Sequence, residues 1–173
     1  MLPRRLAFSL LVLAVCLFGG WRHAEAGPGL FAGATLPVGG FGDLWKAGFH
    51  AGAEYAYPVT PMAGVGLWGA YHRLPTEIAG LGHANMVEVL AIGKLTPPAG
   101  FFLMGGLGFT HLKTTFDVSP LPAGVGTESA TAFTAAGGVG FSVAVLRVTA
   151  LYHNMSKSGS SKSFVTVSAG VGF

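Results

Sequence analysis

The sequence has few charged residues: Asp, Glu, Lys and Arg make up only 10% of its 173 positions. Soluble domains average about 25% charged residues, and they need roughly that share on the surface to stay in water. An apolar share of 51% with 12% aromatic residues also excludes a disordered chain. The composition therefore indicates a folded chain whose outer surface contacts an apolar medium.

The first 26 residues have the pattern of a secretory signal peptide. Arg4 and Arg5 give a positive start, residues 6–18 form an apolar stretch, and residues 24–26 read Ala-Glu-Ala, a small-x-small cleavage site. We therefore expect residues 1–26 to be removed on export.

Cysteine is almost absent, since Cys16 is the only one and it lies inside this leader. Val15 stands where a lipoprotein signal has a small residue, which disfavours lipid attachment at Cys16. An uncleaved anchor helix is the other alternative, but the uncharged run 6–21 is shorter than the roughly 20 residues that a spanning helix needs. The mature domain would be 27–173, without disulfides, thiol catalysis or zinc–thiolate sites.

Excess positive charge is also missing from the mature chain. Removing Arg4, Arg5, Arg22 and Glu25 lowers the formal charge from +3 to +1. No basic stripe with interleaved aromatics is present, so we expect no nucleic-acid partner. The histidines are scattered without metal-ligand spacing, so we expect no metal and no cofactor.

Long apolar helices are disfavoured as well. Three uncharged stretches of 18 residues, 55–72, 95–112 and 129–146, contain prolines or clustered glycines, which are costly in helices. An alternation with period two describes the chain better. The last strand shows it most clearly, with one apolar face against a small, polar face; the apolar face is Val165, Val167, Ala169, Val171 and Phe173.

Aromatic residues recur eight positions apart on the apolar faces of three expected strands. Eight strand residues rise about 26 Å, or about 20 Å along the axis of a barrel whose strands tilt by about 40°. That is close to the apolar band of about 25 Å between the aromatic girdles of an outer-membrane barrel. The expected girdle is Phe49 with Tyr57, Phe101 with Phe109, Phe133 with Phe141, and Tyr71 and Tyr152 at strand ends.

Turn residues divide the mature chain into eight expected strands: 29–37, 46–57, 62–72, 85–95, 100–112, 129–141, 145–153 and 163–173. Three connections are short, and four are longer: 38–45, 73–84, 113–128 and 154–162. Short periplasmic turns opposite longer external loops are typical of outer-membrane barrels. We therefore predict an all-β fold, an antiparallel eight-stranded up-and-down transmembrane β-barrel with both termini on the periplasmic side.

The segments 36–43 (LPVGGFGD) and 105–109 (GGLGF), with the terminal Phe173, resemble the small eight-stranded outer-membrane barrels of Gram-negative bacteria, of the OmpX and opacity-protein type. The resemblance implies a monomer in the outer membrane, exported through the periplasm, surrounded by lipid and lipopolysaccharide, with a structural, adhesive or surface-interaction role. It also implies that the barrel-assembly machinery reads the last strand through Val171 and Phe173.

Charged and histidine side chains share the inward parity of the expected strands. An eight-stranded barrel has room only for side chains or one small ligand. We therefore expect a filled lumen in which Glu54 pairs with Arg147 or Lys94, while a narrow pore or small-molecule conduit is the alternative. The expected polar network is Glu54, Glu88, Lys94, Arg147, His50, His72 and His153. Inward glycines, such as Gly52 and Gly140, would make room for larger side chains.

One enzymatic alternative is lipid A deacylation, because residues 152–156 (YHNMS) bring a histidine close to a serine. That chemistry needs the serine oxygen within reach of the imidazole, and an acid to hold the imidazole. We expect His153 to point inward and Ser156 to enter a loop, and no Asp or Glu follows Ser156. We therefore expect no catalytic residues.

Overall fold

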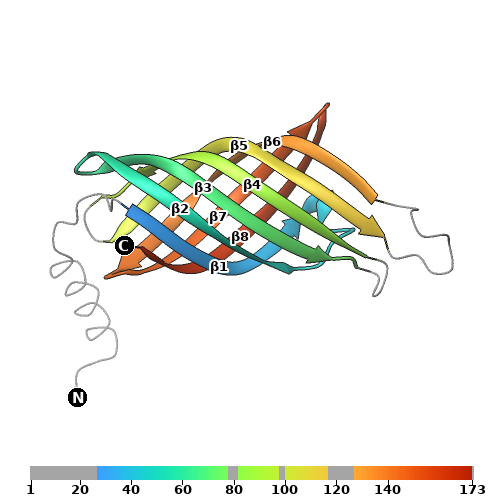
Figure 1. Cartoon of the computed structure of the whole chain (residues 1–173), viewed down its shortest axis with the longest axis horizontal. Coiled ribbons are helices and arrows are strands. Elements are labelled where there is room, and N and C mark those ends of the chain that lie inside the picture. The colour runs from blue at the N-terminus through green and yellow to red at the C-terminus, as the bar shows by residue number, and fades with distance from the viewer. Residues whose placement is uncertain (1–26, 78–81, 98–99, 117–126, 173) are drawn as a thin grey trace, which may run out of the picture.

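The computed structural model describes residues 27–77, 82–97, 100–116 and 127–172, which form a closed barrel (Figure 1). Its strands are β1 Gly27–Val38, β2 Gly48–Thr60, β3 Ala63–Pro75, β4 Gly82–Leu95, β5 Phe101–Phe116, β6 Thr127–Val143, β7 Leu146–Lys157 and β8 Ser160–Gly172. Each strand pairs antiparallel with the next, and β1 pairs with β8 to close the sheet. The predicted fold class is confirmed.

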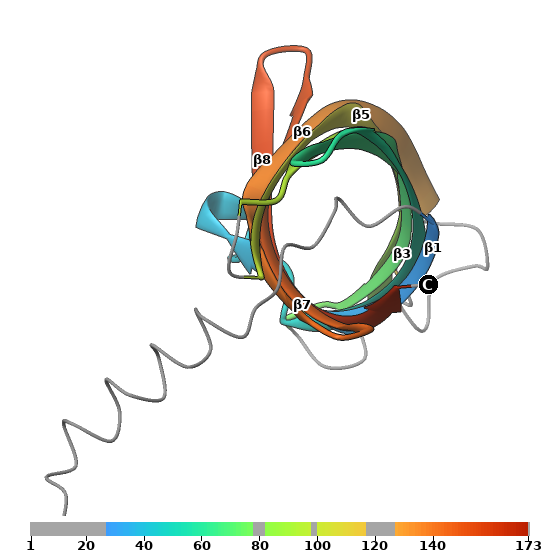
Figure 2. The same ribbon diagram turned by 90° about the vertical axis from the view of Figure 1, so that its left-hand side faces the viewer.

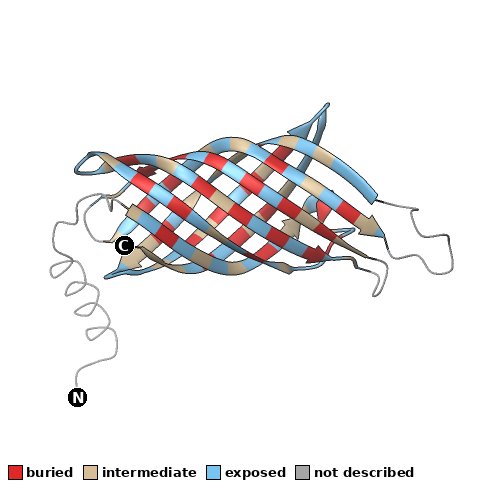
Figure 3. Ribbon diagram, viewed as in Figure 1, coloured by how far each residue is buried: buried red, intermediate tan, exposed pale blue. Residues whose placement is uncertain are grey.

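Alternation along the strands separates a lumen face from an outer face (Figure 3). Successive strand side chains point to opposite faces, so the period-two pattern of the sequence decides which residues lie inside. On β4, for example, Val87 and Val89 are exposed while Glu88 and Leu90 are fully buried. The large apolar side chains on the outside cover the wall that, in a membrane, faces lipid.

The expected girdle aromatics lie on this outer face. Phe49, Tyr57, Phe101, Phe109 and Phe133 are all exposed. The rings pair across strands, because the register sets Phe101 opposite Phe141 and Phe109 opposite Phe133.

The prediction of a long loop over residues 154–162 is wrong. β7 continues to Lys157 and β8 begins at Ser160, which leaves a turn of Ser158 and Gly159. Their φ values are 49° and 84°, the positive pair that a tight type I′ hairpin turn needs. The polar composition indicated a loop, but these strand ends lie beyond the apolar band, where water replaces lipid and the apolar alternation ends.

β5 and β6 are also longer than expected at the loop end, whereas β2 begins at Gly48 and not at the expected residue 46. β5 extends to Phe116 and β6 begins at Thr127. The first loop contains a 3₁₀ turn, η1, over Gly39–Phe41. The turn at 144–145 is as short as predicted, with Ala144 at a φ of 53°.

The expected signal peptide, 1–26, lies outside the described residues. Phe173, part of the expected assembly signal, also lies outside them. Among the described residues, no helix has the length and apolar character to cross a membrane.

Candidate functional site

The lumen is filled by side chains in four layers, which can be read in order along β4. From the loop end toward the termini, β4 contributes Ala84 and Met86 to an apolar layer and Glu88 to a polar layer. Leu90 and Ile92 follow in a second apolar layer, and Lys94 ends in an ion cluster.

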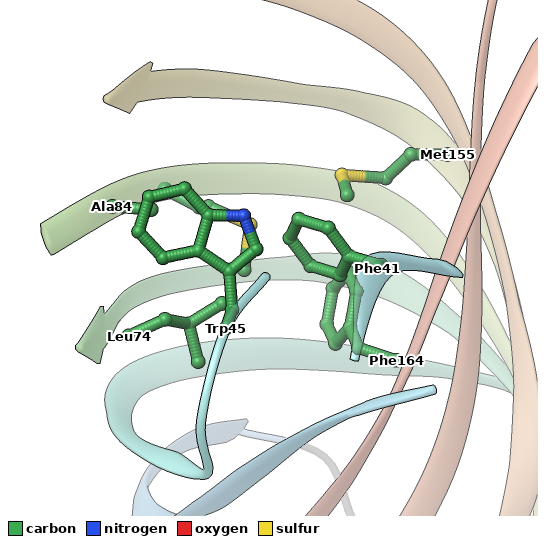
Figure 4. Packing of buried hydrophobic residues seen from close by; sticks show 7 residues of the cluster. Phe41, Trp45, Leu74, Ala84, Met155 and Phe164 are labelled. Carbon is green, nitrogen blue, oxygen red and sulfur yellow. The ribbon is translucent and has the colours of Figure 1, made fainter. Parts of the chain in front are cut away.

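The layer nearest the loops is a buried apolar cluster, here called the loop-end plug (Figure 4). Phe41 and Trp45 come from the first loop, and both are almost fully buried. The plug consists of Phe41, Trp45, Leu74, Ala84, Met86, Met155 and Phe164. The first loop thus packs two aromatic side chains into the loop end of the lumen.

Beneath the plug, Glu88 is the centre of a fully buried polar layer. Its Oε2 lies 3.1 Å from His153 Nδ1 and accepts a 3.2 Å hydrogen bond from Thr110 Oγ1. His153 Nε2 lies 3.0 Å from Thr166 Oγ1. The Thr110 hydroxyl also lies 2.7 Å from that of Thr134. Because a buried polar group without a partner is costly, the contacts of His153 and Thr110 with Oε2 stabilise this carboxyl group in the lumen.

Two further histidines of this layer share one hydroxyl group. Thr35 Oγ1 lies 3.1 Å from His50 Nδ1 and 3.0 Å from His72 Nδ1. A hydroxyl has one hydrogen and two acceptor sites, so at most one of the two rings accepts from Thr35 and at least one donates to it. The rings of His72 and His153 are 6.3 Å apart, which connects the histidine pair to the Glu88 cluster.

The second apolar layer separates the polar layer from the terminal end. Phe31 stacks on Trp68 at 3.7 Å between ring centroids. The buried members are Trp68, Ala70, Leu90, Ile92, Phe102, Met104 and Leu151.

The last layer is an ion cluster around Glu54. Its Oε1 accepts a hydrogen bond of 2.6 Å from Lys94 Nζ and also pairs with Arg147 Nη1. Both cations lie over the Phe102 ring, at 5.0 Å for Lys94 Nζ and 5.6 Å for Arg147 Cζ. The sequence offered Lys94 and Arg147 as alternative partners of Glu54, and the structure brings both to it.

Two inward glycines make room for aromatic rings. A Cβ atom at Gly140 would overlap with the Phe102 ring, and one at Gly52 would come within 2.5 Å of the Phe31 ring carbon Cζ. The Phe102 and Phe31 rings thus lie directly over residues without side chains.

The outer wall carries exposed basic residues just above its aromatic level, toward the loops. Arg73 pairs across the sheet with Asn85, which pairs in turn with Lys113. Arg73 and Lys113, here called the outer basic row, are both exposed. Tyr71 is two residues below Arg73 and donates a 2.6 Å hydrogen bond to Asn85. Arg73 and His83 also line a shallow hollow in the outer wall.

The histidine and serine of the enzymatic alternative lie on opposite faces of β7. His153 is fully buried in the lumen, with Glu88 and Thr166 at its two nitrogens, whereas Ser156 is exposed. The imidazole is therefore held in the buried polar layer of the lumen and not beside Ser156.

Sequence reasoning missed the residues that complete the layers. Phe41 and Trp45 fell in an expected external loop, although two large aromatics among small residues were a usable signal of burial. The threonines of the polar layer share the inward parity, which was the available signal for them.

Among the described residues, no group of three or more His, Cys, Asp or Glu residues is placed to hold a metal ion.

The fold and its apolar outer wall define an eight-stranded barrel of the outer-membrane type. The sequence matches no protein-family model and no curated protein.

Solved structures show the same fold. Ail, the attachment invasion locus protein of Yersinia pestis, aligns over 87% of this chain and 100% of its own, with 18% identity and a TM-score of 0.61. A second Ail structure, in complex with the heparin analogue sucrose octasulfate, aligns with 19% identity, the same coverage and a TM-score of 0.61. The N-terminal β-barrel domain of Pseudomonas aeruginosa OprF aligns over 87% and 100%, with 13% identity and a TM-score of 0.57.

Proposed function

We propose that this chain is an integral outer-membrane protein that acts at the cell surface as a structural or surface-interaction barrel and does not conduct. Export through the periplasm would follow removal of residues 1–26. The observation that carries the proposal is the layered filling of the lumen, because a pore needs a continuous wet path and two of the four layers are apolar.

The cavity volume at the terminal end supports a closed lumen. The space beside Glu54, Trp68 and Arg147 is only about 10 Å³, which is about the volume that one water needs. The ion cluster next to it pairs its charges with one another, so it offers no free charge to a passing ion.

Planar-bilayer recording tests the closed lumen directly. The folded protein should give no steady, resolved current steps across a range of voltages, with a known porin as the positive control. Resolved openings at a reproducible conductance would favour the narrow pore or conduit instead. Folding is checked in the same sample, because a folded barrel migrates differently on cold-detergent gels before and after boiling.

Lipopolysaccharide is the surface partner that we propose for the outer basic row. Arg73 and Lys113 stand just above the apolar wall, at the level where phosphates of the outer leaflet would lie, and cations near a membrane surface attract anionic head groups. The complex of Ail with sucrose octasulfate is a precedent for polyanion binding on this fold.

The double variant Arg73→Gln/Lys113→Gln tests this contact. It should lose most of the thermal stabilisation that lipopolysaccharide gives to the wild type in liposomes, while its melting temperature in pure phosphatidylcholine stays the same. Lys46→Gln, at an exposed residue of the same end that pairs with Glu77, serves as the matched control. Equal stabilisation of wild type and double variant would contradict the contact.

A further inference from the structure

A cavity opens at the loop end between two hairpins that diverge. The ladder between β6 and β7 ends at the pair Phe133 and Ser156. β6 nevertheless begins at Thr127, and its residues 127–132 pair only with β5. The β7–β8 hairpin projects away from the barrel wall at this point (Figures 1 and 2). The gap between the two hairpins holds a cavity of about 280 Å³.

The cavity has an apolar floor and a basic rim. Its floor is Leu112, Ala130, Ala132 and Met155, and its rim is Lys157, Ser158, Ser160 and Lys162. Met155 belongs to the loop-end plug, and Leu112 and Ala132 pack against the same cluster, so the floor is continuous with buried apolar packing. Lys162 Nζ lies 5.6 Å from the centre of the Phe41 ring, which places this cation over the plug.

The two surfaces together select one chemical class of ligand. An apolar floor favours a hydrocarbon body, and two lysines beside it favour a single anionic group at one end of that body. We propose that this cavity binds a single-chain amphiphile with one anionic head, such as a medium-chain carboxylate. The chain would lie against Met155 and Leu112, and the head group would lie between Lys157 and Lys162.

The cavity volume limits the length of the chain. A dry cavity of about 150 Å³ in another protein takes up benzene, so a space of about 280 Å³ suits an apolar body of roughly ten carbon atoms. Decanoate is therefore the probe of choice. A sulfated sugar would contact the lysines but leave the apolar floor wet, which makes it the poorer occupant.

Binding can be followed through Trp45, which lies in the same buried cluster as Met155. The full mature protein in lipid nanodiscs is titrated with 10-bromodecanoate, whose bromine quenches tryptophan fluorescence at short range. Trp45 is almost fully buried in the lumen, so probe dissolved in the surrounding lipid is held away from it by the barrel wall. We expect saturable quenching that unlabelled decanoate reverses and acetate does not.

Variants separate the rim from the floor. Lys157→Gln/Lys162→Gln should weaken 10-bromodecanoate binding by about tenfold or more, whereas Lys46→Gln, at an exposed lysine that pairs with Glu77, should leave it within about twofold. Glu128→Gln should tighten binding, because Glu128 is two residues above Ala130 on the same face of β6. The neutral probe 10-bromodecanol should not distinguish the double variant from the wild type.

Larger side chains in the apolar floor of the cavity test the proposal from the side of the hydrocarbon chain. Ala130→Phe should abolish saturable quenching by both probes, and Ala132→Met provides a second, smaller filling in case the first fails the heat-modifiability check. Unchanged quenching in a folded filling variant would overturn the proposal. An affinity for 10-bromodecanoate that survives loss of both lysines would also overturn it, as would saturable binding of sucrose octasulfate at this rim without any quenching by the brominated acid.

Discussion

Glu88 Oε2 lies 3.1 Å from Nδ1 of His153, and both side chains are completely buried in the lumen of the barrel. The two residues come from β4 and β7, which are not adjacent strands, so their contact crosses the lumen. The same carboxylate accepts a hydrogen bond from Thr110 on β5. One side chain therefore ties together three strands of the barrel.

Glu88→Ala should destabilise the barrel by about 1–3 kcal/mol, because it leaves the buried groups of His153 and Thr110 without their acceptor. Glu88→Gln keeps an oxygen in the same place and should cost clearly less. The free energy of unfolding is measured by urea titration of the refolded protein in phospholipid vesicles. Equal losses of unfolding free energy in the two variants would show that hydrogen bonding by the Glu88 carboxylate does not stabilise this layer.

Phe164 should be among the most costly side chains to truncate. It stacks on His153 at 4.5 Å between ring centroids and belongs to the loop-end plug. Phe164→Ala removes a fully buried ring and should cost about 3–5 kcal/mol in the same titration.

Val167→Ala is the matched control for Phe164→Ala, on the outer face of the same strand, where the side chain is 43% exposed. Its loss should be far smaller, since its side chain contacts the surrounding medium rather than the plug. A loss at Val167 as large as that at Phe164 would show that the stability of the barrel resides in its outer wall.

The strands, and which of their side chains point inward, could be predicted because the period-two pattern is a local property of the sequence. Each inward or outward position follows from a period of two, so the exposed face of β2 and the buried face of β4 can be read from short segments. Of the contacts across the lumen, only that of Glu54 with Lys94 or Arg147 was predicted from the inward parity. The contact of Glu88 with His153, 65 residues further on, depends on strand tilt and register around the whole barrel.

The loop end was predicted least well, also for a physical reason. Beyond the apolar band both faces of a strand contact water, so the alternation that marks β7 up to Tyr152 is lost by Lys157. The burial of Phe41 and Trp45 depends on how the first loop folds back over the mouth, and no periodic pattern describes such a loop.

Gly140→Ala should destabilise the barrel by about 1–3 kcal/mol through overpacking. The new methyl group would overlap with the Phe102 ring, and moving that ring would also disturb Lys94 and Arg147, which lie over it. Gly105→Ala is the control, because a Cβ atom there would meet only Ala136 O, at 3.8 Å. If the two alanines cost the same in vesicle unfolding, the close approach of the Phe102 ring to β6 is not a constraint on this fold.

Glu54→Gln tests whether the ion cluster is held together by charge. The substitution keeps the size of the side chain but leaves Lys94 and Arg147 buried without the carboxylate that they share, so unfolding should become easier by about 3–5 kcal/mol. Glu77→Gln is the comparison, because the pair of Glu77 with Lys46 is 3.6 Å long and half exposed, a kind worth at most about 1 kcal/mol. Both variants are unfolded by urea in vesicles at low and high salt. The loss in Glu54→Gln should persist at high salt, since buried charges are little screened. A loss at Glu54 no larger than that at Glu77 would mean that the two cations reach water, and the terminal end of the lumen would then be open.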